Sequence, residues 1–138
     1  MSSWQVLNEP LAGLWYFAHH YSAWDETGAL CPEGMEQNFQ LCCRRAAHLI
    51  EAHWHIYAPV SHTHPIKMAY PPFAAADSEQ RWYDFDNYFI EAIPFAGLIL
   101  APGWEQSRGC RSEKERFAQL GCPVLYFQDP CNVWASSA

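Results

Sequence analysis

Residues 97–127, GLILAPGWEQSRGCRSEKERFAQLGCPVLYF, contain the part of the chain that decides the fold. The stretch begins with one apolar run, 97–101, and ends with another, 123–127. Apolar runs without alternation are typical of parallel strands that are buried on both faces. A polar loop and a segment with helical spacing lie between them, so the stretch predicts one strand–helix–strand unit. Such folds bind ligands at the carboxyl ends of their strands, and we therefore expect residues 102–111 to contact a ligand.

Strands and helices alternate along the whole chain. Short apolar runs predict four strands, at residues 13–18, 55–60, 97–101 and 123–127. Amphipathic spacing predicts three helices, at residues 32–52, 77–93 and 112–120. This order, without an internal repeat, predicts a single α/β domain over residues 1–138. Its expected architecture is a three-layer α/β/α sandwich on a small parallel sheet of four to five strands in flavodoxin-like order.

Three segments show no regular pattern. Residues 1–12, interrupted by Pro10, are expected to form an irregular arm. The prolines within residues 61–77 predict a long loop, and long loops in compact domains are often functional lids. Residues 128–138 are expected to form a fraying tail.

The composition excludes several classes of partner. The chain has a net charge of −7, which argues against a nucleic-acid polymer or an anionic membrane, because both require basic patches. A small anionic ligand remains compatible, because a local helix N-terminus can bind it. The apolar runs are far shorter than the ~18 residues of a membrane span.

Cytoplasmic localisation is expected from two further features. The first ten residues have neither the basic start nor the apolar stretch of a signal peptide. The six cysteines include no CxxC pair, and Cys42 and Cys43 are adjacent in a predicted helix. We therefore expect reduced thiols.

Two segments carry a resemblance to a known family. Residues 14–18, LWYFA, followed by a polar turn, resemble the first strand of the nucleoside 2-deoxyribosyltransferase superfamily. Residues 107–124 resemble its nucleophile helix, in which a Glu opens the helix and a Gly lies eight residues on, as Glu113 and Gly121 do here. The stretches HIYAPVSHTHPI and PGWEQSRGCRSE are similar to one bacterial branch, and the resemblance extends over residues 13–127.

The resemblance implies cleavage of an N-glycosidic bond in a nucleoside or a nucleoside 5′-monophosphate. A carboxylate attacks the sugar, the base departs, and water or a second base resolves the sugar ester. By position, Glu113 matches the nucleophile and Tyr16 matches the hydroxyl that positions it. Asp86 matches the residue that handles the base or its proton, and Ser107 matches a 5′-phosphate ligand. No cofactor or metal is required.

The resemblance also implies a homo-oligomer, either a dimer or a tetramer. Several aromatic residues would suit an apolar interface between subunits. They are Trp82, Tyr83, Tyr88 and Trp134.

Physical arguments that do not depend on the resemblance also indicate ligand binding by this segment. A carboxylate at a helix N-terminus is stabilised by the helix dipole, so Glu113 is expected to stay ionised. Ser107, Arg108 and Gly109 precede it and offer a hydroxyl, a guanidinium and backbone N–H groups to a phosphate.

Other residues are candidates for direct ligand contact. Trp104 and Tyr16 offer flat faces to a base or a sugar. His19 follows the first predicted strand, and His62 and His64 follow the second, so all three are expected near the same edge of the sheet.

The sequence leaves several alternatives open. The pairs His53-x-His55 and His62-x-His64 permit a metal-binding protein, although His53 is expected to end a helix and His55 to begin a strand. Asp84 competes with Asp86 as the functional carboxylate. A non-catalytic nucleotide-binding or sensing module is the main alternative to an enzyme, and convergence of the catalytic candidates around one pocket would favour the enzyme.

Overall fold

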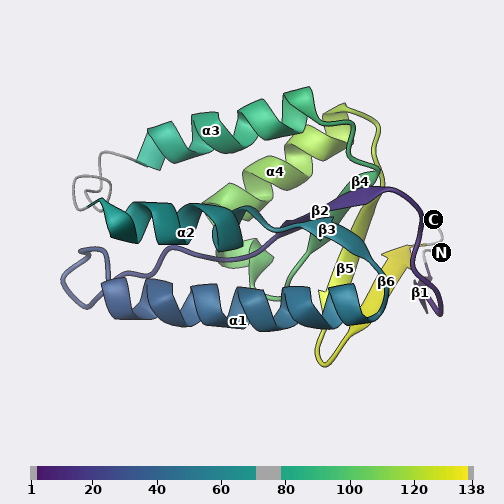
Figure 1. Ribbon diagram of the computed structural model, residues 1–138, viewed down its shortest axis with the longest axis horizontal. Helices are drawn as coiled ribbons and strands as arrows, with labels where there is room; N and C mark the ends of the chain where they lie inside the picture. Colours follow the sequence, from purple (N-terminus) through teal and green to yellow (C-terminus); the bar gives the residue numbers. More distant parts are fainter. Residues whose placement is uncertain (1–2, 71–78, 137–138) are drawn as a thin grey trace.

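Four short parallel strands form the centre of the structure, a computed structural model that describes residues 3–70 and 79–136 (Figure 1). In spatial order they are β3 (His55–Tyr57), β2 (Leu14–Ala18), β4 (Gly97–Leu100) and β5 (Val124–Gln128). Two antiparallel strands continue the sheet beyond β5, first β6 (Asn132–Ser136) and then β1 (Trp4–Val6). The sheet is therefore mixed, with its parallel strands on one side.

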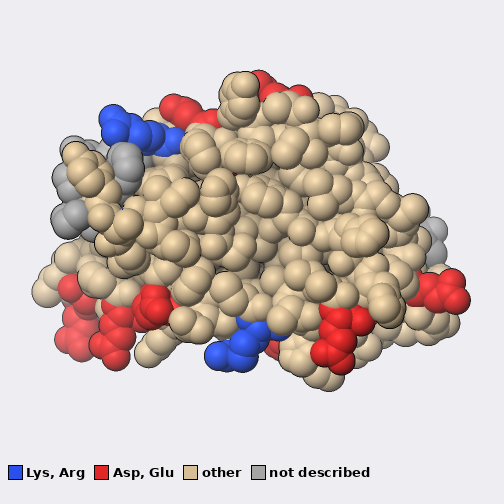
Figure 2. All heavy atoms as spheres, viewed as in Figure 1, with Lys and Arg blue, Asp and Glu red and all other residues tan. Residues whose placement is uncertain are grey.

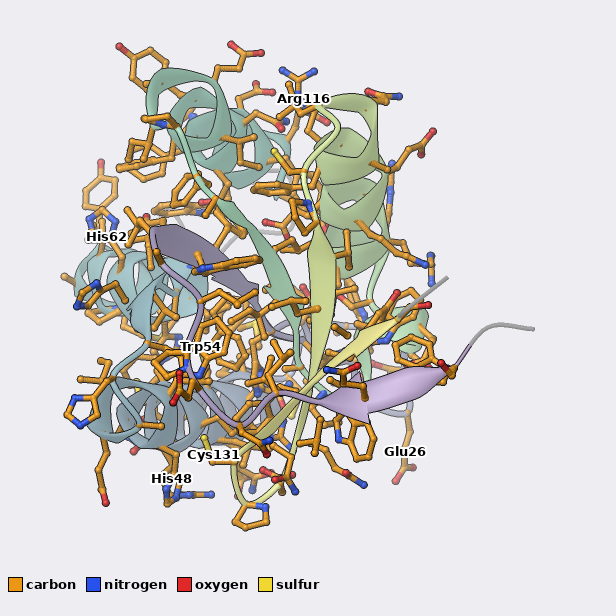
Figure 3. All side chains as sticks on the ribbon, turned by 90° about the vertical axis from the view of Figure 1, so that its right-hand side faces the viewer. Glu26, His48, Trp54, His62, Arg116 and Cys131 are labelled. Carbon is orange, nitrogen blue, oxygen red and sulfur yellow. The ribbon has the colours of Figure 1, made fainter. Side chains whose placement is uncertain are left out.

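Helices cover both faces of this sheet. They are α1 (Pro32–Glu51), α2 (Pro59–Ala69), α3 (Glu79–Ala92) and α4 (Arg108–Gln119), with a short 3-10 helix, η3 (Trp104–Gln106), before α4. Helix α1 packs on one face, and α3 and α4 pack on the other. Figure 3 shows the same layers from the side, with Trp54 between α1 and the strands. Helix α2 lies beside β3 and contacts the helices of both layers. The ring of its His64 stacks on Phe39 of α1, and its His62 contacts Phe85 of α3.

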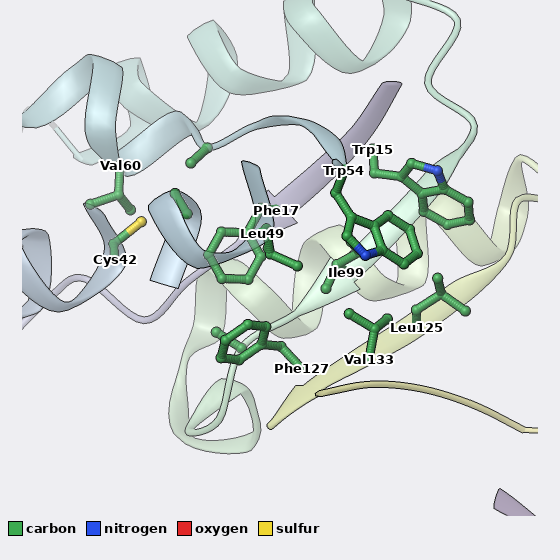
Figure 4. Close-up of a cluster of buried hydrophobic side chains, with 13 residues drawn as sticks. Trp15, Phe17, Cys42, Leu49, Trp54, Val60, Ile99, Leu125, Phe127 and Val133 are labelled. Atoms are coloured by element: carbon green, nitrogen blue, oxygen red, sulfur yellow. The ribbon is translucent and has the colours of Figure 1, made fainter. Parts of the chain in front are cut away.

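Alternate residues of β2 enter two separate cores, because side chains alternate across a strand. Trp15 and Phe17 join the core under α1, where Trp15 meets Trp54 edge to face at 5.8 Å (Figure 4). Tyr16 joins the core under α3 and α4, beside Phe117. Each large buried side chain contributes about 1.5–3 kcal/mol, so β2 is fixed from both sides.

Helix α1 begins where the sequence predicts. Pro32 occupies its first turn, and the Sγ of Cys31 accepts a hydrogen bond from the N–H of Gly34 at 3.4 Å. On its buried side, Arg45 forms a bidentate ion pair with Asp129, with N–O distances of 2.9 and 2.7 Å. This pair fastens α1 to the turn between β5 and β6.

The predicted α/β class is confirmed, but the predicted sheet is wrong in two respects. Within the described residues it has six strands instead of four or five, and β6 and β1 are antiparallel. These two strands occupy the segments that were expected to form an irregular arm and a tail. In β6 only Val133 is buried, between the exposed Asn132 and the partly exposed Trp134. Such short, half-exposed strands give little apolar signal.

The prediction of a loop at residues 61–77 is also wrong for the part of it that the structure describes, because α2 extends to Ala69. Pro59 stands in the first turn of α2, where its missing N–H is no loss, and Pro65 is accommodated inside the helix. The hydroxyl of Thr63 donates to the carbonyl of Pro59 at 2.9 Å. The remainder of the predicted loop, residues 71–78, lies outside the described residues.

The surface carries no continuous basic patch on the face shown in Figure 2. Acidic side chains gather along the side where α1 lies, and Lys and Arg appear in separate places. None of the helices in the described part of the chain is both long and apolar enough to cross a membrane.

Gly97 provides a test of the central packing. A β-carbon at this position would lie 2.4 Å from the carbonyl oxygen of Pro123 and 2.4 Å from Cζ3 of Trp15. We expect Gly97→Ala to lower the free energy of unfolding by about 2–3 kcal/mol, because a tightly packed core does not accept an added methyl group. Chemical denaturation would measure this loss. Gly109→Ala is the control, because this glycine has no positive φ and the side chain nearest to the added carbon, that of Tyr83, stays 3.4 Å away. An equal or larger loss in the control would contradict the packing argument.

Candidate active site

A pocket of about 270 Å3 opens at the carboxyl ends of the parallel strands. His19 and Tyr21 reach it from the segment after β2, and Val60 reaches it from the start of α2. Asp86 of α3 and Glu113 of α4 form part of its other walls. The neighbouring strands β2 and β4 lead to helices on opposite faces, and α/β folds bind ligands in the crevice at such a point.

Tyr16 connects the central strand to this pocket. Its side chain is 0% exposed and packs against the rings of Tyr57 and Phe95, with centroids at 6.0 and 5.3 Å. Its hydroxyl donates a hydrogen bond to Oε2 of Glu113. Burial, together with the nearby carboxyls of Glu113 and Asp86, raises the pKa of Tyr16 well above its ordinary value. The hydroxyl therefore stays protonated and acts as a donor.

Glu113 lies in the second turn of α4, because the helix begins at Arg108 and not near residue 112 as predicted. It is thus away from the N-terminal end of the helix dipole. Burial raises the pKa of Glu113 to about 8, the hydrogen bond from Tyr16 opposes this shift, and the charge of Asp86 adds to it. The expectation that Glu113 stays ionised is wrong, since a carboxyl with this pKa is mostly protonated at pH 7.

Asp86 is the second carboxyl of the pocket. Its Oδ1 atom is buried without a hydrogen-bond partner, and burial raises the pKa of Asp86 to about 7. Asp84 is exposed and accepts a hydrogen bond from Gln80 at 2.9 Å. Of the two aspartates that the sequence left open, Asp86 lines the pocket.

The start of α4 forms a polar wall. Ser107, Arg108 and Gly109 all line the pocket, as the sequence predicts for a ligand loop. The Oγ of Ser107 caps the helix by accepting from the N–H of Cys110 at 3.2 Å. A β-carbon at Gly109 would stand 3.4 Å from Cε1 of Tyr83, so the glycine leaves free space in the pocket.

His19 also lines the pocket, but both of its ring nitrogens have partners. Nδ1 lies 2.7 Å from the carbonyl of His20 and therefore donates to it, and Nε2 accepts from Arg45 at 2.9 Å. Burial lowers the pKa of His19 to about 4. The ring is thus a neutral part of the wall, held by the Arg45–Asp129 ion pair, and has no free nitrogen for proton transfer.

Four predicted ligand contacts are not among the pocket residues. The ring of Tyr16, expected to face a base or a sugar, is enclosed in the core. Trp104 packs beside Tyr126 at 5.9 Å and lies under the ammonium of Lys114 at 4.6 Å. His62 is exposed at the edge of the molecule, toward α3 (Figure 3). His64 is buried on the opposite side of α2, against α1. The prediction for the two histidines failed because α2 is a helix, in which residues two apart point in different directions.

The sequence argument missed several pocket residues. Tyr21 lies two residues after His19, in the same polar turn, and Thr63 lies in the helix that was predicted as a loop. On α3, Tyr83 and Ile90 share a helical face with Asp86. This spacing was a usable signal, although Tyr83 had been considered only as an interface residue.

The histidine pairs do not form a metal centre in the structure. Within residues 3–70 and 79–136, no three His, Cys, Asp or Glu side chains converge in a way that could hold a metal ion. His53 lies in the turn after α1 with a φ of 71°, and His55 begins β3. Burial raises the pKa of the Cys110 thiol to about 12, so this cysteine of the ligand loop is not a reactive thiolate.

The structure is that of an α/β protein with a pocket at the carboxyl edge of its parallel strands, and two protonatable carboxyls line this pocket. Residues 13–129 match the family described as "Domain of unknown function (DUF1937)", and the chain belongs to this family. The matched range contains all segments that line the pocket. No curated protein and no solved structure matches the chain.

The raised pKa of Glu113 predicts a particular dependence of stability on pH. The folded-state pKa of about 8 exceeds the ordinary value of 4.5, so the folded protein binds more protons than the unfolded chain between these values. Stability from this group is fully present below pH 4.5 and is lost as the pH rises to 8, by up to about 1.4 kcal/mol per pH unit.

Glu113→Gln removes this dependence, so the difference in unfolding free energy between the wild type and the variant should shrink or change sign as the pH rises from 5 to 8. His19, whose pKa is lowered, changes the stability of both proteins in the opposite direction, so its contribution cancels in the difference between wild type and variant. Denaturant titrations at each pH would measure it. Glu115→Gln, at an exposed position of the same helix, should run parallel to the wild type. A parallel curve for Glu113→Gln would contradict the assignment.

Proposed function

We propose that this protein cleaves the N-glycosidic bond of a nucleoside or a nucleoside 5′-monophosphate, as a hydrolase or transferase with Glu113 as the nucleophile. The observation that supports this proposal is that Asp86 of α3 and Glu113 of α4 line one pocket, while the hydroxyl of Tyr16 on β2 reaches Glu113 from the core. The resemblance to the nucleoside 2-deoxyribosyltransferase superfamily assigns roles to the same three residues, which lie far apart in the sequence.

The first step requires an ionised Glu113 and a protonated Asp86. A carboxylate oxygen of Glu113 attacks the anomeric carbon, and the C–N bond breaks with its electron pair passing to the base. Asp86 donates its proton to the departing nitrogen. The hydroxyl of Tyr16 holds the attacking carboxyl in place, and a sugar ester on Glu113 results. Water or a second base then attacks the same carbon and releases Glu113.

The two carboxyls can reach this reactive state near neutral pH. Their pKa values of about 7 and about 8 mean that the pair carries a single proton in this range. Because the pKa of Asp86 is the lower of the two, this proton lies mainly on Glu113, and the hydrogen bond from Tyr16 supports the minor arrangement from which the reaction starts, with Glu113 ionised and the proton on Asp86. One carboxyl then acts as nucleophile and the other as acid, as in retaining glycosidases.

The start of α4 supports a phosphorylated substrate. Its free backbone N–H groups, the hydroxyl of Ser107 and the exposed guanidinium of Arg108 lie at the same pocket as the carboxyls. A helix N-terminus with an arginine attracts a phosphate even in a protein with a net charge of −7. Gly109 keeps the space beside Tyr83 open.

A non-catalytic binding or sensing module is the second candidate. It is favoured by the protonated state of Glu113 at neutral pH, because a protonated carboxyl donates a hydrogen bond to a ligand and does not attack it. The homo-oligomer implied by the resemblance stays a prediction. Of the aromatic residues expected at its interface, Tyr88 is 72% exposed and Tyr83 lines the pocket.

Base release distinguishes the two candidates. Purified protein would be incubated with ribo- and deoxyribonucleosides and their 5′-monophosphates, and the free base would be measured by chromatography. We expect release by the wild type and a loss of about 1,000-fold or more in Glu113→Ala, because the variant has no nucleophile. Glu115→Ala is the control on the exposed side of α4. No release from the wild type, together with a ligand-induced rise in melting temperature, would favour the binding module.

The pH dependence of the same reaction reports the two carboxyls. The rate with limiting substrate should fall below about pH 7, where both carboxyls are protonated and no nucleophile remains. It should also fall above about pH 8, where both are ionised and no acid remains. A bell-shaped profile of kcat/KM with its maximum between these values is expected. A rate that continues to rise up to pH 10 would contradict the role of Asp86 as acid.

A further inference from the structure

A second chain of proton-transfer groups starts at the same pocket. The hydroxyl of Tyr21 lies 2.6 Å from Nδ1 of His64, and Nε2 of His64 lies 2.5 Å from Oε2 of Glu36. His64 is only 2% exposed, whereas the side chain of Glu36 is 51% exposed. Hydrogen bonds from Gln40 and His64 lower the pKa of Glu36, so its carboxylate is ionised and accepts the Nε2 proton. When Nε2 of the neutral imidazole carries the proton, Nδ1 has none and accepts a hydrogen bond from the hydroxyl of Tyr21.

The surroundings hold these groups in place. The ring of His64 stacks on Phe39 at 4.4 Å. The side-chain amide of Asn38 donates to the backbone carbonyl of Tyr21 at 2.8 Å. The ammonium of Lys67 lies 5.3 Å above the ring of Tyr21. Burial and the charge of Glu36 raise the pKa of Tyr21 to about 12, so its hydroxyl stays protonated and can accept a proton only as it passes its own to His64. The arrangement has the same logic as a serine–histidine–aspartate triad, with a phenol in place of the serine.

A neighbouring tyrosine–histidine pair shows what sets this one apart. Tyr57 and His62 are 3.0 Å apart, but His62 is exposed and neither residue lines the pocket. No carboxylate of the described residues contacts the other ring nitrogen of His62. Tyr21 and His64 therefore combine three features: a place at the pocket, a buried imidazole and an ionised carboxylate behind it.

We propose that Tyr21, backed by His64 and Glu36, is the general base of this pocket and takes a proton from the water that resolves the sugar ester. This inference rests on the proposed function and assigns its second step. Tyr21 is the group that contacts the water. His64 and Glu36 act through Tyr21.

The protons of the complete cycle balance. As the water oxygen bonds to the anomeric carbon, its proton passes to the oxygen of Tyr21, and the proton of Tyr21 passes to Nδ1 of His64. The ester bond breaks with its electron pair returning to Glu113. Glu36 stabilises the imidazolium without being protonated. The imidazolium then returns its proton through Tyr21 to Asp86, which lost one to the base in the first step. One proton circulates, and one water is consumed for each base released.

The test separates the two halves of the reaction. Release of the base from the substrate that the wild type cleaves would be followed at a protein concentration high enough to detect one base per protein molecule. The mass of the intact protein would be measured by mass spectrometry. Tyr21→Phe and His64→Gln retain Glu113 and Asp86. We expect each to release a burst of about one base per protein and then to turn over about 100-fold or more slowly than the wild type. The mass of the protein should rise by that of one glycosyl group.

His62→Gln is the matched control, because it changes the other tyrosine–histidine pair on the same helix. It should show the wild-type rate and no trapped ester. Glu113→Ala should show no burst, which distinguishes a lost nucleophile from a lost base. Melting temperatures would show that Tyr21→Phe is folded, and His64→Gln provides a second variant if it is not. Wild-type turnover in both variants would overturn the assignment while leaving the proposed function intact. No release from the wild type would overturn both.

Discussion

The hydrogen bond between Tyr16 and Glu113 joins the central strand to the helix that carries the pocket carboxyl. Tyr16 cannot move, because β2 is paired on both sides and its ring is enclosed by aromatic neighbours. The position of Glu113 is therefore set by the core of the sheet and not by a loop. Burial at this point is also what raises the pKa of the carboxyl. Stability and chemistry at this site have the same physical origin.

The sequence predicted the parts of the fold that depend on buried apolar runs and on helical spacing, such as β2, β4 and α1. It did not predict α2, because Pro59 and Pro65 are usually read as breakers and only the local geometry shows that both are tolerated. The carboxyl candidates Asp86 and Glu113 were found from the resemblance. The raised pKa of Glu113 could not be predicted, because it arises from burial by segments distant in the chain.

The pocket has few groups that carry a fixed charge at neutral pH. His19 is neutral because of burial, and the carboxyls of Asp86 and Glu113 share protons. Arg108 provides a positive charge at the rim. The interior of such a pocket suits an uncharged group, and its edge suits an anionic one.

The pairing of β1 with β6 places Trp4 beside Ser136. Because β6 runs antiparallel to β5, with Gln128 opposite Asn132, Ser136 lies at the end of the sheet where the parallel strands begin. The pocket opens at the end where they finish. Any tag, tether or fused domain attached beyond Trp4 or Ser136 therefore starts on the side away from the pocket, and the protein can be anchored to a surface at either point with its binding site still facing solution.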